Sequence, residues 1–172
     1  MASELRVDRI IPTTGVPTGG GGGIIQVVQA STTSRAATSS TSYVSTNLSA
    51  TITPRFSTSK IYITLGGDTN SNGTANVQYL TYYRSINGGA FSNIAPNGPN
   101  DSAGADSNRG LCMCYGESSR IQVPIAMPFL DSPNTTQPVE YKVYQKSESG
   151  TVEFPADNGY QAARMFLFEV SA

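Results

Sequence analysis

A run of five consecutive glycines, Gly19–Gly23, divides the chain into two parts of very different length. Glycine has no side chain to pack and loses the most backbone entropy on folding, so such a run is a poor core element and a good hinge. As a flexible coil, five residues have a root-mean-square span of about 12 Å. We therefore predict an N-terminal arm (residues 1–18), a glycine hinge (Gly19–Gly23) and a head domain (residues 24–172).

The arm carries four apolar side chains in a segment too short to bury them: Leu5, Val7, Ile10 and Ile11. The first two alternate with charged residues, as in a half-exposed strand. Two prolines farther along keep the rest of the arm extended and non-helical. We expect the arm to dock on another subunit or on another protein; a disordered tail is the simpler alternative.

The head shows β-type patterns up to the C-terminus, with turn signals between most of them and no helical periodicity. Asn87-Gly88-Gly89 is a hairpin signal, because Asn and Gly accept positive φ. The predicted strands are residues 24–29, 43–45, 48–53, 60–65, 77–86, 90–94, 111–115, 121–129, 139–146, 151–154 and 165–170. This pattern predicts an all-β head, an antiparallel β-sandwich or jelly-roll-like fold, preceded by an extended N-terminal arm.

Three polar stretches are predicted as loops: Ser31–Ser42, Gly66–Asn76 and Ala95–Gly110. Binding residues favour loops held by a rigid scaffold, so the last two stretches are candidates for recognition, with plain solvated loops as the alternative. The candidate binding residues of the longest loop are Asn100, Asp101, Asp106, Asn108 and Arg109.

The last predicted strand, Met165–Val170, is apolar on both faces. Such a strand is either central in a sandwich or placed at an interface between subunits. In Val139–Lys146, Val139, Tyr141, Val143 and Gln145 share one face of the strand. Pro124 and Pro128 indicate an edge strand or a bulge.

Composition argues against several classes of function. The net charge is −1 and no dense Lys/Arg cluster occurs, so we expect no nucleic-acid partner. No apolar run is long enough for a transmembrane helix and the start lacks a secretory signal, so we expect no membrane insertion. We expect no cofactor and no metal.

Catalysis is not expected. Histidine is absent, which removes the Ser-His-Asp type of hydrolase and the usual zinc sites. Paired carboxylates remain an alternative, as in glycosidases, and the candidates are Asp101, Asp106, Glu140, Glu148 and Glu153. Solvated turn residues are the preferred interpretation of the two aspartates.

Three further features have both a structural and a functional interpretation. Cys112 and Cys114 are expected to be two small buried thiols rather than a metal or redox pair. Oxygen ligands for calcium occur within Gly66–Asn76, without the spacing of an EF-hand loop. Seven tyrosines suit interfaces or sugar-binding surfaces, although core or cross-strand packing is the preferred interpretation: Tyr79, Tyr82, Tyr83, Tyr115, Tyr141, Tyr144 and Tyr160.

Four stretches, in this order, resemble the fibre and related virion structural proteins of tailed bacteriophages, particularly those of marine and cyanobacterial phages. They are Ser3–Gly15, Ile24–Gln29, Ser49–Ile61 and Phe129–Val143. The resemblance implies a homotrimeric β-head, an N-terminal segment that docks on the virion, and a distal surface that binds the host cell. Typical fibres place a long shaft between anchor and head, whereas this chain has only the glycine hinge.

From the resemblance we expect a virion structural protein, a short tail fibre or spike displayed on the particle exterior after synthesis in the host cytoplasm. Its arm would attach to a baseplate, neck, tail or capsid protein, and its long loop would bind a host cell-surface glycan or protein. The candidate trimer interface is Tyr141, Val143, Phe166 and Phe168. The alternatives are a capsid decoration (cement) protein and, less favoured, a carbohydrate-binding module or an enzyme acting on cell-surface polysaccharide.

Overall fold

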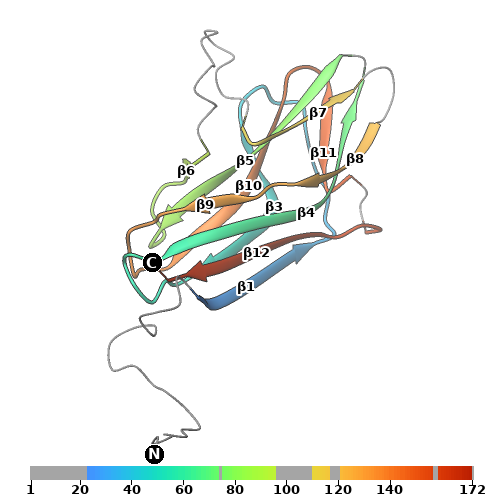
Figure 1. The fold of residues 1–172 in the computed structure, drawn as a ribbon. Coiled ribbons are helices and arrows are strands. Elements are labelled where there is room, and N and C mark those ends of the chain that lie inside the picture. The colour runs from blue at the N-terminus through green and yellow to red at the C-terminus, as the bar shows by residue number, and fades with distance from the viewer. Residues whose placement is uncertain (1–22, 74, 96–109, 117–120, 157–158, 172) are drawn as a thin grey trace, which may run out of the picture.

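A computed structural model describes residues 23–73, 75–95, 110–116, 121–156 and 159–171. Within these ranges the chain forms twelve β-strands and no helix (Figure 1). The strands build two antiparallel sheets that pack face to face as a β-sandwich. The all-β, antiparallel sandwich predicted from the sequence is therefore confirmed.

The larger sheet, sheet A, is organised around the long strand β4. The N-terminal half of β4 pairs with β12 on one side and β9 on the other, and its C-terminal half pairs with β11 and β8. Strand β1 extends the sheet beyond β12, and β2 extends it beyond β11. The bounds are β1 (Ile24–Thr32), β2 (Ala36–Thr38), β4 (Lys60–Asn72), β8 (Ile121–Ala126), β9 (Phe129–Asp131), β11 (Thr151–Phe154) and β12 (Ala163–Val170).

The smaller sheet, sheet B, has β10 between β3 and β5, with β6 and β7 along the other side of β5. Its bounds are β3 (Val44–Ile52), β5 (Asn76–Ile86), β6 (Ser92–Asn93), β7 (Cys112–Gly116) and β10 (Val139–Ser147). The predicted hairpin joins β5 to β6. Asn87 and Gly88 both adopt positive φ, at 50° and 72°, and Gly89 N donates to Ile86 O over 3.0 Å.

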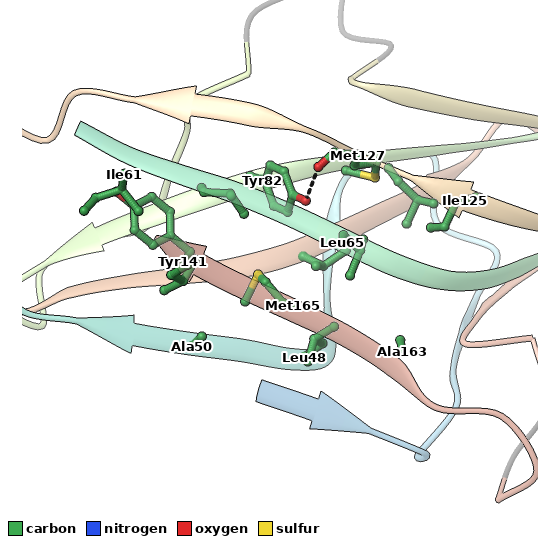
Figure 2. Close-up of a cluster of buried hydrophobic side chains, with 14 of the residues drawn as sticks. Leu48, Ala50, Ile61, Leu65, Tyr82, Ile125, Met127, Tyr141, Ala163 and Met165 are labelled. Carbon is green, nitrogen blue, oxygen red and sulfur yellow. Dashed lines mark hydrogen bonds between the residues drawn. The ribbon is translucent and has the colours of Figure 1, made fainter. Parts of the chain in front are cut away.

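The apolar core lies between the sheets, where alternate residues of each strand point inward (Figure 2). Leu48 of β3, Leu65 of β4 and Met165 of β12 are at most 1 % exposed. Each fully buried side chain of this size contributes about 1.5–3 kcal/mol. Tyr82 adds a polar contact to the core, because its hydroxyl donates to Met127 O over 2.8 Å.

The prediction that Gly66–Asn76 is a loop is wrong for most of its length. Strand β4 continues to Asn72, paired with β8 along one edge and β11 along the other. Its polar side chains are buried because hydrogen bonds within the protein replace water. Thr69 donates to Gln78 Oε1, and Asn70 Nδ2 donates to Glu153 Oε2 over 2.7 Å.

Two other predicted segments differ in their boundaries. The loop Ser31–Ser42 contains the end of β1 and the three-residue strand β2. The predicted strand 121–129 is divided into β8 and β9, and both pair with the same edge of β4. Pro124 lies within β8, which pairs with no described strand other than β4, so the edge position indicated by this proline is confirmed.

Candidate interaction surfaces

The outward surface of sheet A carries a continuous row of apolar side chains across four strands. The register places Val27 of β1 opposite Phe168 of β12, Phe168 opposite Tyr62 of β4, and Tyr62 opposite Leu130 of β9. Three of the four are well exposed, with Val27 at 55 %, Tyr62 at 39 % and Leu130 at 51 %. The Tyr62 and Phe168 rings lie 6.1 Å apart between centroids.

The neighbouring outward positions extend this surface along β12 and β1. Phe166 stacks on Phe168 with ring centroids 6.2 Å apart, and Ile24 is 61 % exposed opposite Val170. We call the seven residues the apolar face: Ile24, Val27, Tyr62, Leu130, Phe166, Phe168 and Val170. Of the charged residues on this outward side of β12 and β4, Arg164 and Lys60 lie at strand ends, and Asp68 lies in the C-terminal half of β4, where it accepts from Gln122. The arrangement is an apolar centre with a polar rim.

The two faces of β12 account for the apolar composition of the last predicted strand. Met165 and Leu167 point into the core and are fully buried, whereas Phe166 and Phe168 alternate with them on the outward side and are half-buried. The interpretation as a central strand is confirmed, and the interface between subunits stays a prediction. It is central in sheet A, between β1 and β4, and its outer side belongs to an exposed apolar surface.

Tyr141 and Val143 occupy a different place from the two phenylalanines with which the sequence grouped them. Both point into the core from β10 and have no exposed surface. The Tyr141 hydroxyl donates to Asp131 Oδ2 over 2.7 Å, and Arg84 Nη1 lies 2.8 Å from the same oxygen. Their side chains pack within one chain and are not available to a second one. Only Phe166 and Phe168 of the candidate trimer interface reach the surface.

The edge strand β1 has one feature that discourages further strand pairing, a register shift in its ladder with β12 between Ile24 and Gln26. It pairs with β12 on one side, and no described strand pairs with the other. Its nine residues include no proline and no charged side chain. The opposite edge of sheet A is formed by β8 and β9, where Pro124 interrupts the row of N–H donors. Natural sheets block exposed edges with prolines, charges or bulges, so the β1 edge is blocked only by the irregularity near its first residues.

Most of the other tyrosines gather on the outward surface of sheet B. Tyr83 and Tyr144 stack with centroids 3.9 Å apart, and Tyr43 lies 6.1 Å from Tyr83. Lys146 Nζ lies 4.9 Å from the centroid of the Tyr79 ring and 5.2 Å from that of Tyr43. Burial raises the pKa of the Tyr43 and Tyr83 phenols. These ring faces contact neighbours in the same chain, which favours cross-strand packing over sugar stacking.

Two tyrosines are openly exposed. Tyr115 of β7 is 52 % exposed and lies on the same strand as Met113, which is 57 % exposed. Tyr160 is 91 % exposed in the turn before β12. The two cysteines of β7 point the other way. Both are free, Cys114 is buried and Cys112 half-buried, and burial raises the pKa of each thiol.

The candidate carboxylates that the structure describes have partners. Glu140 lies 3.4 Å from Lys142 Nζ, the Glu148 carboxylate accepts from the Tyr79 hydroxyl over 3.0 Å, and Glu153 pairs with Arg35 over 2.8 Å. Within the described ranges, no three His, Cys, Asp or Glu side chains gather where they could hold a metal ion. The proposed calcium ligands in β4 are instead used inside the sheet, where Asp68 accepts from Gln122.

Several predicted sites lie outside the described residues. They are the arm residues Leu5, Val7, Ile10 and Ile11, the hinge glycines Gly19, Gly20, Gly21 and Gly22, and the loop residues Asn100, Asp101, Asp106, Asn108 and Arg109. Gly23 is described, and its carbonyl accepts from Ser171 N over 3.1 Å. The part of the chain that the structure describes contains no helix long and apolar enough to cross a membrane.

The sequence missed three members of the apolar row, Val27, Tyr62 and Leu130. The available signal was the outward alternation of Tyr62 against Ile61 and Ile63, but the register between strands cannot be read from one strand at a time. Compared with known proteins, the chain matches no family model and no curated protein.

Proposed function

We propose that this chain is a structural protein of a tailed-bacteriophage virion, a short tail fibre or spike that acts as a homotrimer. In this proposal the arm, residues 1–18, attaches it to another virion protein, and the head is displayed on the particle exterior. The observation that carries the proposal is the apolar face. Monomeric soluble proteins rarely expose large contiguous apolar patches, and such patches mark association surfaces.

The position of the apolar face relative to the arm supports the same conclusion. Ile24 is both the first residue of β1 and an exposed member of the face, and it follows the glycine hinge directly. The surface expected to associate therefore begins at the residue that follows the hinge. A domain that recognised only a soluble ligand would need neither the arm nor this surface.

A capsid decoration protein is the second candidate. The hinge of five glycines spans only about 12 Å as a coil, so the head stays close to whatever the arm holds. That short reach suits a capsid clamp as well as a short spike. A carbohydrate-binding module has less support, because the ring faces of the sheet B tyrosines pack against neighbours in the same chain rather than facing a sugar.

Imaging of the virion tests the proposal. Antibody against the head should label purified particles at the tail, baseplate or neck if the chain is a fibre or spike, and over the capsid if it is a decoration protein. Particles without label would refute a virion role.

Deletion of residues 1–17 tests the arm. The truncated head should keep its β-type circular dichroism and no longer join the particle. Normal incorporation of the truncated chain would show that the arm is not the anchor.

A further inference from the structure

We propose that other copies of this chain cover the apolar face, so that the outward surfaces of β1, β12, β4 and β9 from three copies meet around a three-fold axis and form the interface between copies. This inference rests on the proposed homotrimer and assigns its contact surface. The centre of the interface is the row Val27, Phe168, Tyr62 and Leu130, with Phe166 stacked beside it.

The shape of the row suits packing against another sheet. Its four members come from four adjacent strands at matching register positions, so they form a ridge that crosses the sheet. Around a three-fold axis, the ridge of each copy can insert its side chains between those of its two neighbours, as the side chains of the two sheets interdigitate in the core of this molecule. The aromatic members also provide large, rigid contact area at little cost in conformational entropy.

The distribution of charge favours an identical partner. Transient interfaces between different proteins are about as polar as the rest of the surface, whereas homo-oligomer interfaces are more apolar. Here the centre holds no charge, and Arg164 and Lys60 lie at the rim. The net charge of the chain is −1, so copies gain little repulsion on meeting.

The edge formed by β1 belongs to the same surface. Val27 belongs both to β1 and to the apolar row, so the exposed face continues to a strand edge without proline or charge. The proline-bearing edge at β8 lies on the other side of β4. A surface that joins an exposed apolar face to an edge without proline or charge is one that assembly covers.

The test uses the full chain and measures mass by analytical ultracentrifugation between 1 and about 50 μM. The wild-type chain should sediment as a trimer of about 54 kDa, three times 18.1 kDa. Val27→Asp and Leu130→Asp each place a carboxylate in the centre of the row, where burial without a partner is costly. Each should weaken association at least about tenfold.

Met113→Asp is the matched control. Met113 is 57 % exposed on a strand, as Val27 is at 55 %, but it lies on the outward surface of sheet B. This variant should keep the wild-type mass. Circular dichroism checks that each variant folds. Because Val27→Asp and Leu130→Asp lie in different strands, the mass of one variant can still be interpreted if the other unfolds.

A wild-type chain that is monomeric across this range overturns the inference, and this includes the case in which the arm of the same chain covers the face. Unchanged association in both row variants, or equal loss in Met113→Asp, overturns the choice of surface. These outcomes leave the virion role standing, because the position of the label on particles does not depend on the oligomeric state. Conversely, a trimer held by this face would stand even if no particle carried the label.

Discussion

Replacing Tyr141 with phenylalanine should weaken the fold and leave association unchanged, because the Tyr141 hydroxyl belongs to a buried ionic cluster. It donates to Asp131 Oδ2 over 2.7 Å, and the tyrosine side chain has no exposed surface. A hydrogen bond to a charged group contributes about 1.5–3 kcal/mol. Asp131 still keeps Arg84, whose Nη1 lies 2.8 Å from both carboxylate oxygens. We therefore expect Tyr141→Phe to lower the free energy of unfolding by about 2 kcal/mol.

Arg84→Met should lower it further. The Asp131 side chain is 9 % exposed, and without Arg84 its charge would keep only the Tyr141 hydroxyl. Removing one partner of a buried ion pair costs about 3–5 kcal/mol. Arg84→Met should have the larger effect because Arg84, and not Tyr141, neutralises the charge of the Asp131 carboxylate.

Urea unfolding at pH 7, followed by circular dichroism because the chain has no tryptophan, measures both effects. Tyr144→Phe is the control, since Tyr144 lies on the outward side of the same strand; it should change the free energy by less than about 0.5 kcal/mol. A Tyr141→Phe chain as stable as wild type would refute the cluster argument. If the Tyr141→Phe chain lost the trimer mass but kept its stability in urea, Tyr141 would belong to the subunit interface.

Three other outcomes are expected. Gly110→Ala should lower the free energy of unfolding by more than Gly88→Ala. Both glycines have a φ of +72°, but a Cβ at Gly110 would clash with Leu80 O, while a Cβ at Gly88 would meet open space. Equal losses of stability in urea would contradict this. Burial raises the pKa of the Tyr82 and Tyr141 phenols, so the unfolded chain loses these protons at a lower pH than the folded chain does. The free energy of unfolding should therefore fall above pH 10, by up to about 1.4 kcal/mol per pH unit for each tyrosine. Urea unfolding from pH 9 to 11 measures this slope, and a flat profile would argue against it. Substitutions within residues 95–110 should change adsorption of the phage to its host but not particle assembly, and unchanged adsorption would favour the decoration protein.

The alternation of β10 shows what sequence pattern can and cannot provide. The period of two correctly grouped Val139, Tyr141, Val143 and Gln145 on one side of the strand, and all four are buried. The pattern says which residues share a face, but not whether that face meets the other sheet of the same chain or another molecule. For this reason the sequence alone predicts Tyr141 at an interface between copies. In the structure its hydrogen-bond partner, Asp131, comes from β9 on the opposite sheet of the same chain.

The polar half of β4 was missed for a related reason. Thr69, Asn70 and Ser71 have the composition of a loop, and only partners distant in the sequence make their burial favourable. Gln78 of β5 accepts from Thr69, and its Nε2 donates to Gln145 Oε1 of β10 over 2.9 Å, so the network continues to a third strand. A local window contains none of these partners, so a sequence of this kind predicts solvent exposure where the fold provides a buried hydrogen-bond network.

If the proposed interface is right, alternate positions of β12 serve folding and association separately. Leu167 is fully buried between the sheets, so Leu167→Ala removes core packing and should cost about 2–5 kcal/mol in the stability of a single chain. Phe168, the next residue, contacts Tyr62 on the outward side, so Phe168→Ser should act mainly on the contact between copies. If Phe168→Ser cost as much urea stability as Leu167→Ala while the trimer persisted, the outward side of β12 would be part of the fold of one chain rather than a surface kept for another.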